Sequence, residues 1–293
     1  MTKKVAVIND LSGFGRCSLT AAISVLAAMG VSPCPYPTAV LSGQTGYPSF
    51  FCDDYTDRME AIRQEWETMQ VSFQGIYTGY IASESQFYHI FRFLESFRTS
   101  DTFLLVDPVM GDNGQPYKMY TPELCRQMKQ LALQADYVTP NLTEFCLLTD
   151  SDYSAFSSIT DPQILQDSLR AAAAPFWENS SRAFIITGIP ISDSNGAFSQ
   201  IGNLYLAPTQ GELSAFPYIG GSFSGTGDLF ASVLTGGIAR GDSPAALIRL
   251  AGKFIECAMQ DSVKHHVPRN DGTDYEPHLW MLTPQAFKKD EYL

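Results

Sequence analysis

The chain has 293 residues, and its 19 Lys and Arg residues against 31 Asp and Glu residues give a formal net charge of −12. Such an acidic surface repels phosphate backbones and anionic lipid, which argues against a nucleic-acid-binding protein or a polybasic membrane protein. Charged residues make up 17% of the chain, below the roughly 25% of ordinary soluble domains, while apolar residues make up 45%. The composition predicts a large core and some apolar surface covered in an oligomer.

The six cysteines are scattered without a CxxC pair, which indicates free thiols in a cytosolic protein rather than a zinc site or a disulfide framework. The first apolar run, Val5–Ile8, is shorter than the roughly 7–15 residues of a signal-peptide core. No uncharged stretch reaches the ~18 apolar residues of a membrane span. We therefore expect a cytoplasmic protein with no membrane partner.

Short β-branched runs alternate with helical apolar periodicity along the whole chain. Strands are expected at Val5–Ile8, Tyr36–Leu41, Gly75–Ile81, Phe103–Asp107, Tyr137–Pro140, Phe184–Thr187 and Asn203–Ala207. Helices are expected over Leu19–Ala27 and at about 55–69, 84–98, 122–134, 161–176, 228–239 and 244–263. Repeated βα units predict an α/β fold in a single domain, with helices on both faces of a mainly parallel sheet.

Two strand-like runs within Asn203–Tyr218 flank Pro208–Gly211, which predicts a small antiparallel hairpin. In parallel sheets, ligands bind beyond the carboxyl ends of the strands. We therefore expect the chemistry in residues that follow each strand directly.

The strongest candidate site is the glycine-rich run Gly220–Asp228, which leads into an apolar helix. Glycines let a backbone approach a ligand closely, and the first turn of a helix offers unpaired N–H groups, so the run predicts an anion site. Asp228 beside an anion is costly unless it has a task, such as accepting the proton of an attacking hydroxyl. A glycine-rich turn with Asp228 as the helix N-cap is the structural alternative.

Acidic and amide residues follow two further strands. Asp107 precedes Pro108, and Asp112 comes five residues later, so the pair suits a hydrated Mg²⁺ on nucleotide phosphates or simply forms turns. Asn141 and Glu144 share one helical face, where they could organise metal-bound water or form a capping box.

A polar run with Thr38, Ser42 and residues 44–47 follows the second strand, and Tyr80 follows the third. These residues suit a small polar, aromatic substrate, although Tyr80 alone is also explained as an amphipathic residue at a rim. Gly13–Ser18 lacks the third glycine of a dinucleotide-binding fingerprint and is equally explained as a tight turn.

Several of these motifs resemble the ribokinase superfamily in their order and spacing: Asp107–Asp112, Thr139–Glu144 and Gly225–Asp228. Ser42–Tyr47 and Thr78–Tyr80 are similar to the pyridoxal (vitamin B6) kinase branch. The resemblance covers about residues 5–265. It implies a ribokinase-like three-layer α/β/α sandwich and ATP-dependent phosphorylation of the 5′-hydroxymethyl group of pyridoxal, pyridoxamine or pyridoxine.

The resemblance also implies a role for each motif. Asp228 would be the catalytic base, and the amides of Gly225, Thr226 and Gly227 would hold the transferring phosphoryl group. Mg²⁺ and its waters would lie at Asp107, Asp112, Asn141 and Glu144. The nucleotide would contact Asp107, Asp112, Asn141, Thr187 and Thr226, and the vitamin would contact Thr45 and Tyr80. Family members are usually cytosolic homodimers and often use a monovalent cation such as K⁺.

The chain departs from this family after the first strand. The family commonly has Gln-Ser-His there, with the serine touching the pyridine ring, whereas this chain has Asn9-Asp10-Leu11-Ser12. We expect Asp10 and Ser12 at the substrate, with the carboxylate favouring a protonated ring nitrogen or an added donor. A hydroxymethylpyrimidine kinase of thiamin salvage and a non-catalytic vitamin-binding protein are the alternatives.

Overall fold

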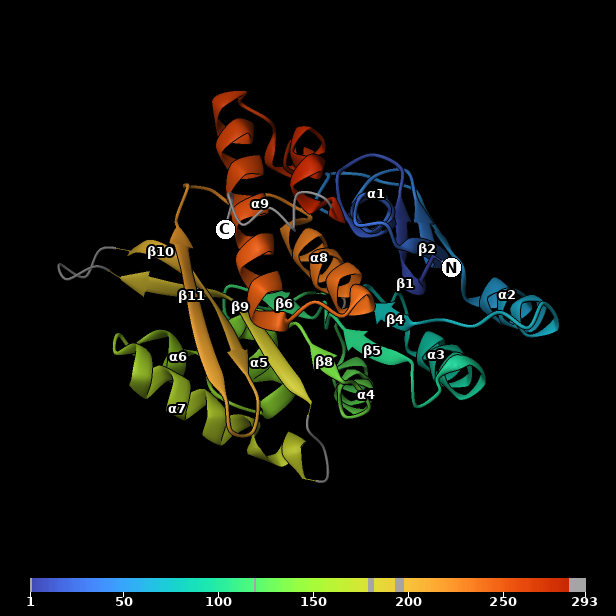
Figure 1. Ribbon diagram of the computed structural model, residues 1–293, viewed down its shortest axis with the longest axis horizontal. Coiled ribbons are helices and arrows are strands. Elements are labelled where there is room, and N and C mark those ends of the chain that lie inside the picture. Colours follow the sequence, from blue (N-terminus) through green and yellow to red (C-terminus); the bar gives the residue numbers. More distant parts are fainter. Residues whose placement is uncertain (1, 119, 179–181, 193–197, 285–293) are drawn as a thin grey trace. The chain divides into compact units, whose positions relative to one another are not determined.

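The protein is described by a computed structural model that covers residues 2–118, 120–178, 182–192 and 198–284. The chain forms two compact units, of which unit 1 comprises Met1–Phe103 and Ile219–Leu293 and unit 2 comprises Leu104–Tyr218. Figure 1 labels their helices and strands. The expectation of a single domain stays a prediction.

Unit 1 is built around a short, mostly parallel sheet. Its strands are β1 (Lys4–Ser12), β2 (Ser32–Leu41), β3 (Cys52–Asp54) and β4 (Gly75–Thr78), in the order β4-β1-β2-β3. Its helices are α1 (Ser18–Ala28), α2 (Thr56–Thr68), α3 (Glu84–Phe97), α8 (Thr226–Arg240) and α9 (Pro244–Lys264), followed by 3-10 turns at Arg269–Asp271 and Glu276–Leu282. β1 pairs in parallel with β2 and β4, and β3 adds an antiparallel edge.

The helices of unit 1 lie on both faces of its sheet. The chain passes from β1 to β2 through α1, and from β2 back across β1 to β4 through α2. Because such crossovers are right-handed, the two connections place α1 and α2 on opposite faces. α8 packs against α1 and α9, and α2 packs against α3, as the ribbon in Figure 1 also shows.

Helix α1 ends where the sequence predicts. Gly30 adopts φ 77°, a left-handed conformation that suits glycine. Its N–H donates to the carbonyl of Ala27 at 3.0 Å, while the N–H of Val31 donates to that of Leu26 at 2.9 Å. This pattern of two crossed bonds satisfies the last carbonyls of the helix and stops it.

Prolines prevent strand pairing along the first half of β2, on the edge that faces away from β1. Ser32 donates its N–H to Lys3 on the β1 side, so the nitrogens of Pro33, Pro35 and Pro37 point to the opposite edge. Prolines have no N–H to donate, so this edge presents no ladder donors at three alternating positions. The sequence thereby protects the sheet from pairing with another strand.

Unit 2 contains parallel strands that continue into an antiparallel hairpin. Its strands are β5 (Phe103–Val106), β6 (Gly111–Asp112), β7 (Gln115–Pro116), β8 (Tyr137–Val138), β9 (Ala183–Ser192), β10 (Phe198–Leu206) and β11 (Gly211–Pro217). Its helices are α4 (Pro122–Ala132), α5 (Leu142–Thr149), α6 (Tyr153–Ser157) and α7 (Pro162–Ala173), with a 3-10 turn at Ala174–Trp177. β8 pairs in parallel with β5 and β9, whereas β9, β10 and β11 are antiparallel.

The predicted α/β class, the mainly parallel pairing and the hairpin are confirmed. Some strand bounds differ, because side chains or prolines take over at the strand ends. β4 stops at Thr78 rather than Ile81, since the N–H of Tyr80 donates to the side chain of Asn9. β8 stops before Pro140, which has no N–H to extend a ladder. Among the described helices, none combines the length and the hydropathy that a bilayer crossing requires.

Gly237 lies at the contact of α8 with α9, where a Cβ would fall 2.0 Å from Cδ2 of the fully buried Leu247. We expect Gly237→Ala to lower the free energy of unfolding in urea by about 1–3 kcal/mol, because the packed side chain has no room to move. Helix propensity alone would raise it. Ala61→Gly, at an exposed position of α2, is the control and should cost about 0.5–1 kcal/mol. A more stable Gly237→Ala variant would contradict this account of the packing.

Candidate active site

The glycine-rich turn (Gly220–Gly227) ends at the amino terminus of α8. Gly225 is the N-cap and adopts φ 83°. A Cβ on Gly225 would lie 2.0 Å from the carbonyl oxygen of Arg16, so the close approach of two backbone segments requires glycine here. Thr226 and Gly227 open the helix, and the N–H groups of such a first turn have no partner within the helix.

Asp228 lies in the first turn of α8 but does not cap it. Its Oδ1 accepts a hydrogen bond of 3.1 Å from Nδ2 of Asn9, a residue 219 positions away in the sequence. The backbone N–H of Ser18, at the start of α1, also stabilises the carboxylate. The alternative of an N-cap aspartate is therefore wrong: Gly225 caps the helix, and Asp228 is held by β1 and α1.

Asn9 connects three parts of this site. Its Oδ1 accepts the N–H of Tyr80 at 2.8 Å and that of Asp10 at 3.0 Å, while its Nδ2 donates to Asp228. Asn9 is completely buried, and a Cβ on Gly79 would lie 2.4 Å from its Nδ2. Glycine at position 79 therefore makes the room in which this amide aims at Asp228.

Burial keeps the carboxylate of Asp228 close to its protonation midpoint. Burial is the largest cause that raises its pKa, to about 6, and the charge of Asp10 adds to the rise. The bonds from Ser18 and Asn9 lower it and so oppose the shift in part. A carboxylate with such a pKa can both accept and release a proton near neutral pH.

Asp10 is the second buried carboxylate of this group and is 5% exposed. Its Oδ2 accepts the hydroxyl of Ser12 at 2.8 Å, and the Ser18 side chain donates to it as well. Burial nevertheless raises the pKa of Asp10 above its ordinary value. Burial, then the charges of Asp228 and Asp10, raise the pKa of the neighbouring Cys17 thiol to about 12, so this thiol is neutral.

Tyr80 belongs to the same group of residues. Its carbonyl accepts the hydroxyl of Thr38 at 2.9 Å. Burial, and then the charge of Asp10, raise the pKa of its phenol to about 12. The structure therefore brings together Asp10, Ser12, Tyr80 and Asp228, which were predicted from separate segments of the sequence.

The loop of residues 42–47 carries Thr45, which is exposed. Its neighbour Gln44 fixes the loop, since Nε2 donates to Oγ of Ser224 at 3.3 Å and to the carbonyl of Asn270 at 3.1 Å. The loop is thus attached to the glycine-rich turn. The sequence did not indicate the contribution of Asn9, Ser18 or Asn270, because nothing in its local pattern gives any of these polar residues a role.

In unit 2, Asn141 and Glu144 form the capping box that the sequence left open. Oδ1 of Asn141 accepts the N–H of Glu144 at 2.9 Å, and Oε2 of Glu144 accepts the N–H of Asn141 at 2.8 Å. The box also reaches the segment that follows β5. Oε1 of Glu144 accepts the N–H of Met110 at 3.0 Å, and Nδ2 of Asn141 donates to the carbonyl of Gly111 at 2.8 Å.

The other residues predicted in unit 2 lie around this box. Asp107 is 7% exposed and accepts the hydroxyl of Thr139 at 3.1 Å. Thr187 donates its N–H to the carbonyl of Pro140 at 2.9 Å and bridges to Asn141. Asp112 is the exposed last residue of β6, and its Oδ1 accepts the N–H of Asn113.

Two carboxylates in this group repel each other. Burial first, and then the charge of Asp107, raise the pKa of Glu144 well above its ordinary value. Within the described ranges, no cluster of three or more His, Cys, Asp or Glu side chains forms a ready metal cage. The oxygen donors nevertheless fit Mg²⁺, which needs few protein ligands because it keeps several of its waters, and a cation would relieve the repulsion.

Comparison with known proteins identifies the family. The chain matches the phosphomethylpyrimidine kinase family over residues 15–271. It belongs to this family. A candidate phosphomethylpyrimidine kinase from Bacteroides thetaiotaomicron, solved in a form with pyridoxal, is 34% identical over 96% of each chain, with a TM-score of 0.87.

Pyridoxal kinases are also similar to this chain over most of its length. The enzyme from Lactobacillus plantarum is 26% identical over 100% of both chains, with a TM-score of 0.83. The pyridoxal kinase of Dictyostelium discoideum is 24% identical over 259 residues, which are 85% of this chain and 82% of that protein. The resemblance to B6 kinases of the ribokinase superfamily, and the fold it implies, are confirmed.

Asp228→Asn should stabilise the protein at neutral pH, because the folded state raises the pKa of this carboxyl from 3.8 to about 6. Between these values the unfolded chain is ionised while the folded chain holds its proton, so the wild type loses stability as pH rises. We expect the advantage of the variant in unfolding free energy to grow from about pH 4 to pH 6 and level off near 1–3 kcal/mol.

Urea unfolding of both proteins at pH 5 and pH 7.5 measures this difference. Asp57→Asn, the same change at an exposed position of α2, is the control. If Asp228→Asn is less stable than the wild type at pH 7.5, then the hydrogen bonds to the carboxylate outweigh the cost of burying its charge, and this account is wrong.

Proposed function

We propose that this chain is an ATP-dependent kinase that phosphorylates the 5′-hydroxymethyl group of pyridoxal, pyridoxamine or pyridoxine. The observation that carries the proposal is the carboxylate of Asp228, with a pKa of about 6, beside the amino end of α8. The similar structures include one solved with pyridoxal, and pyridoxal kinases of Staphylococcus aureus solved with ADP and with pyridoxal.

The reaction requires a proton acceptor and a site for charge on the moving phosphoryl group. Asp228 takes the proton of the hydroxymethyl group while the oxygen of that group forms a bond to the γ-phosphorus of ATP. The bond between the γ-phosphorus and the bridging oxygen of the β-phosphate breaks. The N–H groups of Gly225, Thr226 and Gly227 donate to the equatorial oxygens of the phosphoryl group. ADP and the vitamin 5′-phosphate are the products.

Substrate and nucleotide are assigned to the two groups of residues described above. Asp10, Ser12, Thr45 and Tyr80 bind the vitamin, with the Asp10 carboxylate facing a ring or substituent donor. The residues proposed for the nucleotide are Asp107, Asp112, Asn141, Thr187 and Thr226. Asp107, Asn141 and Glu144 would hold Mg²⁺, and the ion would neutralise phosphate charge when bound. We also propose that the enzyme uses a monovalent cation such as K⁺ as a cofactor.

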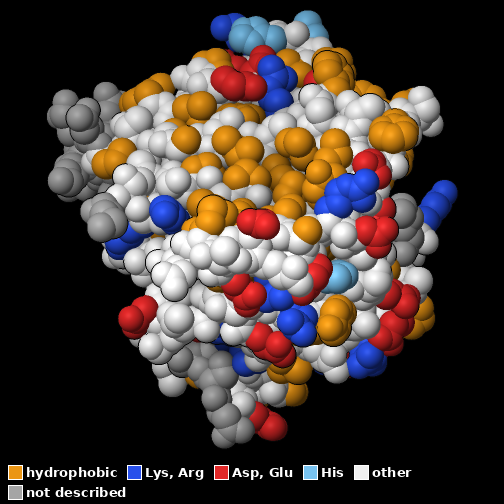
Figure 2. Space-filling view, turned by 90° about the vertical axis from the view of Figure 1, so that its right-hand side faces the viewer, with side chains coloured by type: hydrophobic (Ala, Val, Ile, Leu, Met, Phe, Trp, Pro, Cys, Tyr) orange, Lys and Arg blue, Asp and Glu red, His pale blue; other side chains and the backbone are white. Residues whose placement is uncertain are grey.

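The protein is proposed to act as a cytoplasmic homodimer. Apolar side chains gather on the face shown in Figure 2, on the side of Figure 1 where α1, β2 and α2 are labelled. Pro35 of β2 and Phe51 are among the exposed apolar residues of unit 1, on a protein whose net charge of −12 otherwise disfavours self-association. Light scattering during size-exclusion chromatography tests the dimer, and a monomeric mass would refute it.

A substrate panel tests the activity directly. The protein is incubated with ATP, Mg²⁺ and each of the three vitamers, and the 5′-phosphate is measured. Because the family description names a phosphomethylpyrimidine, the pyrimidine with a free hydroxymethyl group, hydroxymethylpyrimidine, is the second candidate substrate. Competition between this pyrimidine and pyridoxal, scored as the ratio of kcat/KM, decides between the two. No phosphorylated vitamer in any reaction would refute the proposal, and binding without turnover would favour a vitamin-binding protein.

Asp228→Asn should lower kcat by about 10²–10⁴-fold, the usual contribution of a positioned base, with little change in the affinity for the vitamin. In the wild type, kcat/KM should fall as pH decreases below about 6, because the carboxylate becomes protonated. Steady-state rates between pH 5 and pH 8 measure both effects, with Asp57→Asn as the control. An unchanged kcat in Asp228→Asn would remove this residue from the role of base.

Asp107→Asn should raise the Mg²⁺ concentration needed for half-maximal rate by roughly 10-fold or more, the usual cost of losing a group that orients metal-bound water. Asp167→Asn, at an exposed position of α7, is the matched control. Rates are measured at fixed ATP over a Mg²⁺ titration. Equal half-maximal concentrations in wild type and Asp107→Asn would place the ion elsewhere.

A further inference from the structure

A segment far from every sequence motif holds three loops of unit 1 together. We call this segment, Arg269–Glu276, the strap. It follows α9 and carries no catalytic signature in the sequence. Its contacts reach the glycine-rich turn, the loop of residues 42–47 and the turn before α1, which contains Arg16.

Backbone bonds attach the strap to two of these loops. The N–H of Ser224 donates to the carbonyl of Arg269 at 3.1 Å, which fixes the glycine-rich turn. The N–H of Arg16 donates to the carbonyl of Asp271 at 3.0 Å. A Cβ on Gly225 would lie 2.0 Å from the Arg16 carbonyl oxygen, and a Cβ on Gly272 would lie 2.7 Å from the Cβ of Arg16, so Arg16 packs closely against both glycines. The N-cap Gly225 is therefore positioned by its contact with Arg16, and Arg16 is positioned by its hydrogen bond to the strap.

Side chains of the strap fix the loop of residues 42–47. Oδ1 of Asp271 accepts the hydroxyl of Tyr47 at 2.6 Å, and Nδ2 of Asn270 donates to the carbonyl of Gly46 at 2.7 Å. The Tyr47 ring also packs against Phe14, with ring centroids 5.7 Å apart. Removal of the Tyr47 hydroxyl would therefore release one bond and leave the ring contact in place.

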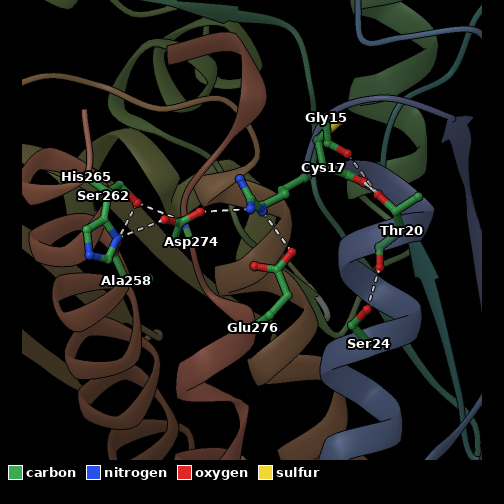
Figure 3. Close-up of polar contacts among 10 residues, drawn as sticks. Gly15, Cys17, Thr20, Ser24, Ala258, Ser262, His265, Asp274 and Glu276 are labelled. Atoms are coloured by element: carbon green, nitrogen blue, oxygen red, sulfur yellow. Dashed lines mark hydrogen bonds and ion pairs between the residues drawn. The ribbon is translucent and has the colours of Figure 1, made fainter. Parts of the chain in front are cut away.

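Ion pairs fasten the far end of the strap, as Figure 3 shows. Nη2 of Arg16 lies 2.8 Å from Oδ1 of Asp274, and its Nε lies 2.8 Å from Oε1 of Glu276. Asp274 is held in turn, because its N–H donates to Oγ of Ser262 at 2.8 Å and its Oδ2 lies 3.3 Å from Nδ1 of His265. These contacts join α9 to the turn before α1.

We propose that the strap is a positioning element that holds the acceptor loop (residues 42–47) against the glycine-rich turn. Its two fastenings are the hydrogen bond between Tyr47 and Asp271 and the ion pairs of Arg16 with Asp274 and Glu276. The proposal rests on the kinase function above, since it assigns the loop to the vitamin and the turn to the phosphoryl group. Tyr47 and Arg16 act through backbone position and touch no reacting atom.

The two fastenings should therefore have different kinetic signatures. Tyr47→Phe releases the loop, so KM for pyridoxal should rise about 3–10-fold, the worth of one hydrogen bond, with kcat and KM for ATP unchanged. Arg16→Met shifts the support of Gly225, so kcat should fall by roughly 10-fold or more, because small misplacements of reacting groups are costly. Arg16→Lys should recover part of that loss, since Lys keeps the charge but not the two-pronged geometry.

Hydrogen–deuterium exchange of the full chain supplies a readout that does not depend on activity. Tyr47→Phe should speed exchange in peptides that cover residues 42–51, and Arg16→Met should speed it in peptides that cover residues 219–228. The controls are Tyr88→Phe, an exposed tyrosine of α3, and Arg126→Met, which breaks an exposed ion pair with Glu123 in α4. Both should match the wild type in exchange and in kinetics.

Two outcomes overturn the proposal. One is a Tyr47→Phe protein with wild-type KM for pyridoxal and wild-type exchange in residues 42–51. The other is a loss of kcat in Arg16→Met that accompanies global destabilisation and is not recovered by Arg16→Lys. If the wild type phosphorylates no vitamer, the kinase function fails, while the exchange rates still decide whether the strap holds the two loops.

Discussion

The hydrogen bond between Asn9 and Asp228 is the constraint on which the rest of the site depends. It joins the end of β1 to the first turn of α8, and it exists only because Gly79 leaves room for the amide and Gly225 lets the turn lie against Arg16. A carboxylate in a first helical turn would ordinarily face water or cap the helix. Here the same residue is turned into the protein, where burial raises its pKa to about 6. The geometry thus gives a common helix-start residue the pKa that the proposed role of proton acceptor requires.

The environment of Asp228 is acidic, and this limits what the site can bind. Asp10 lies close enough for its charge to raise the pKa of Asp228, of Tyr80 and of the Cys17 thiol. Hydroxyl donors from Ser12 and Ser18 are the partners described for the Asp10 carboxylate. A ligand that brings a hydrogen-bond donor or a positive charge would compensate this charge, whereas an acidic ligand would add to the repulsion. A nitrogen heterocycle whose ring nitrogen is protonated meets this condition, which is why the vitamers and hydroxymethylpyrimidine are both candidates.

Local sequence patterns predicted most of the fold, because strand, helix and cap signals act over a few residues. Gly30 stops α1, the capping box of Asn141 and Glu144 opens α5, and the hairpin turns near Pro208. The motifs also located Asp10, Ser12, Tyr80 and Asp228, which the structure groups in unit 1. The sequence could not reveal Asn9, Ser18 or the strap, since their contacts join residues far apart in the chain, 219 positions for Asn9 to Asp228 and 260 for Arg16 to Glu276. An asparagine in a strand or an arginine in a turn carries no local sign of such a partner.

The same desolvation that raises the pKa of Asp228 toward the range of the proposed base also works against the folded state. A carboxyl whose pKa rises on folding favours folding only while it is protonated, so at neutral pH its ionisation weakens the fold. A residue kept purely for structure would be easier to accommodate as an amide, which retains an acceptor oxygen for the Asn9 donor without the buried charge. The protein keeps the acid, and supports it with a completely buried asparagine, a left-handed Ser18 with φ 51°, and a glycine at position 225. Strained and costly groups of this kind gather where a site has chemical work to perform, and here they converge on one oxygen pair.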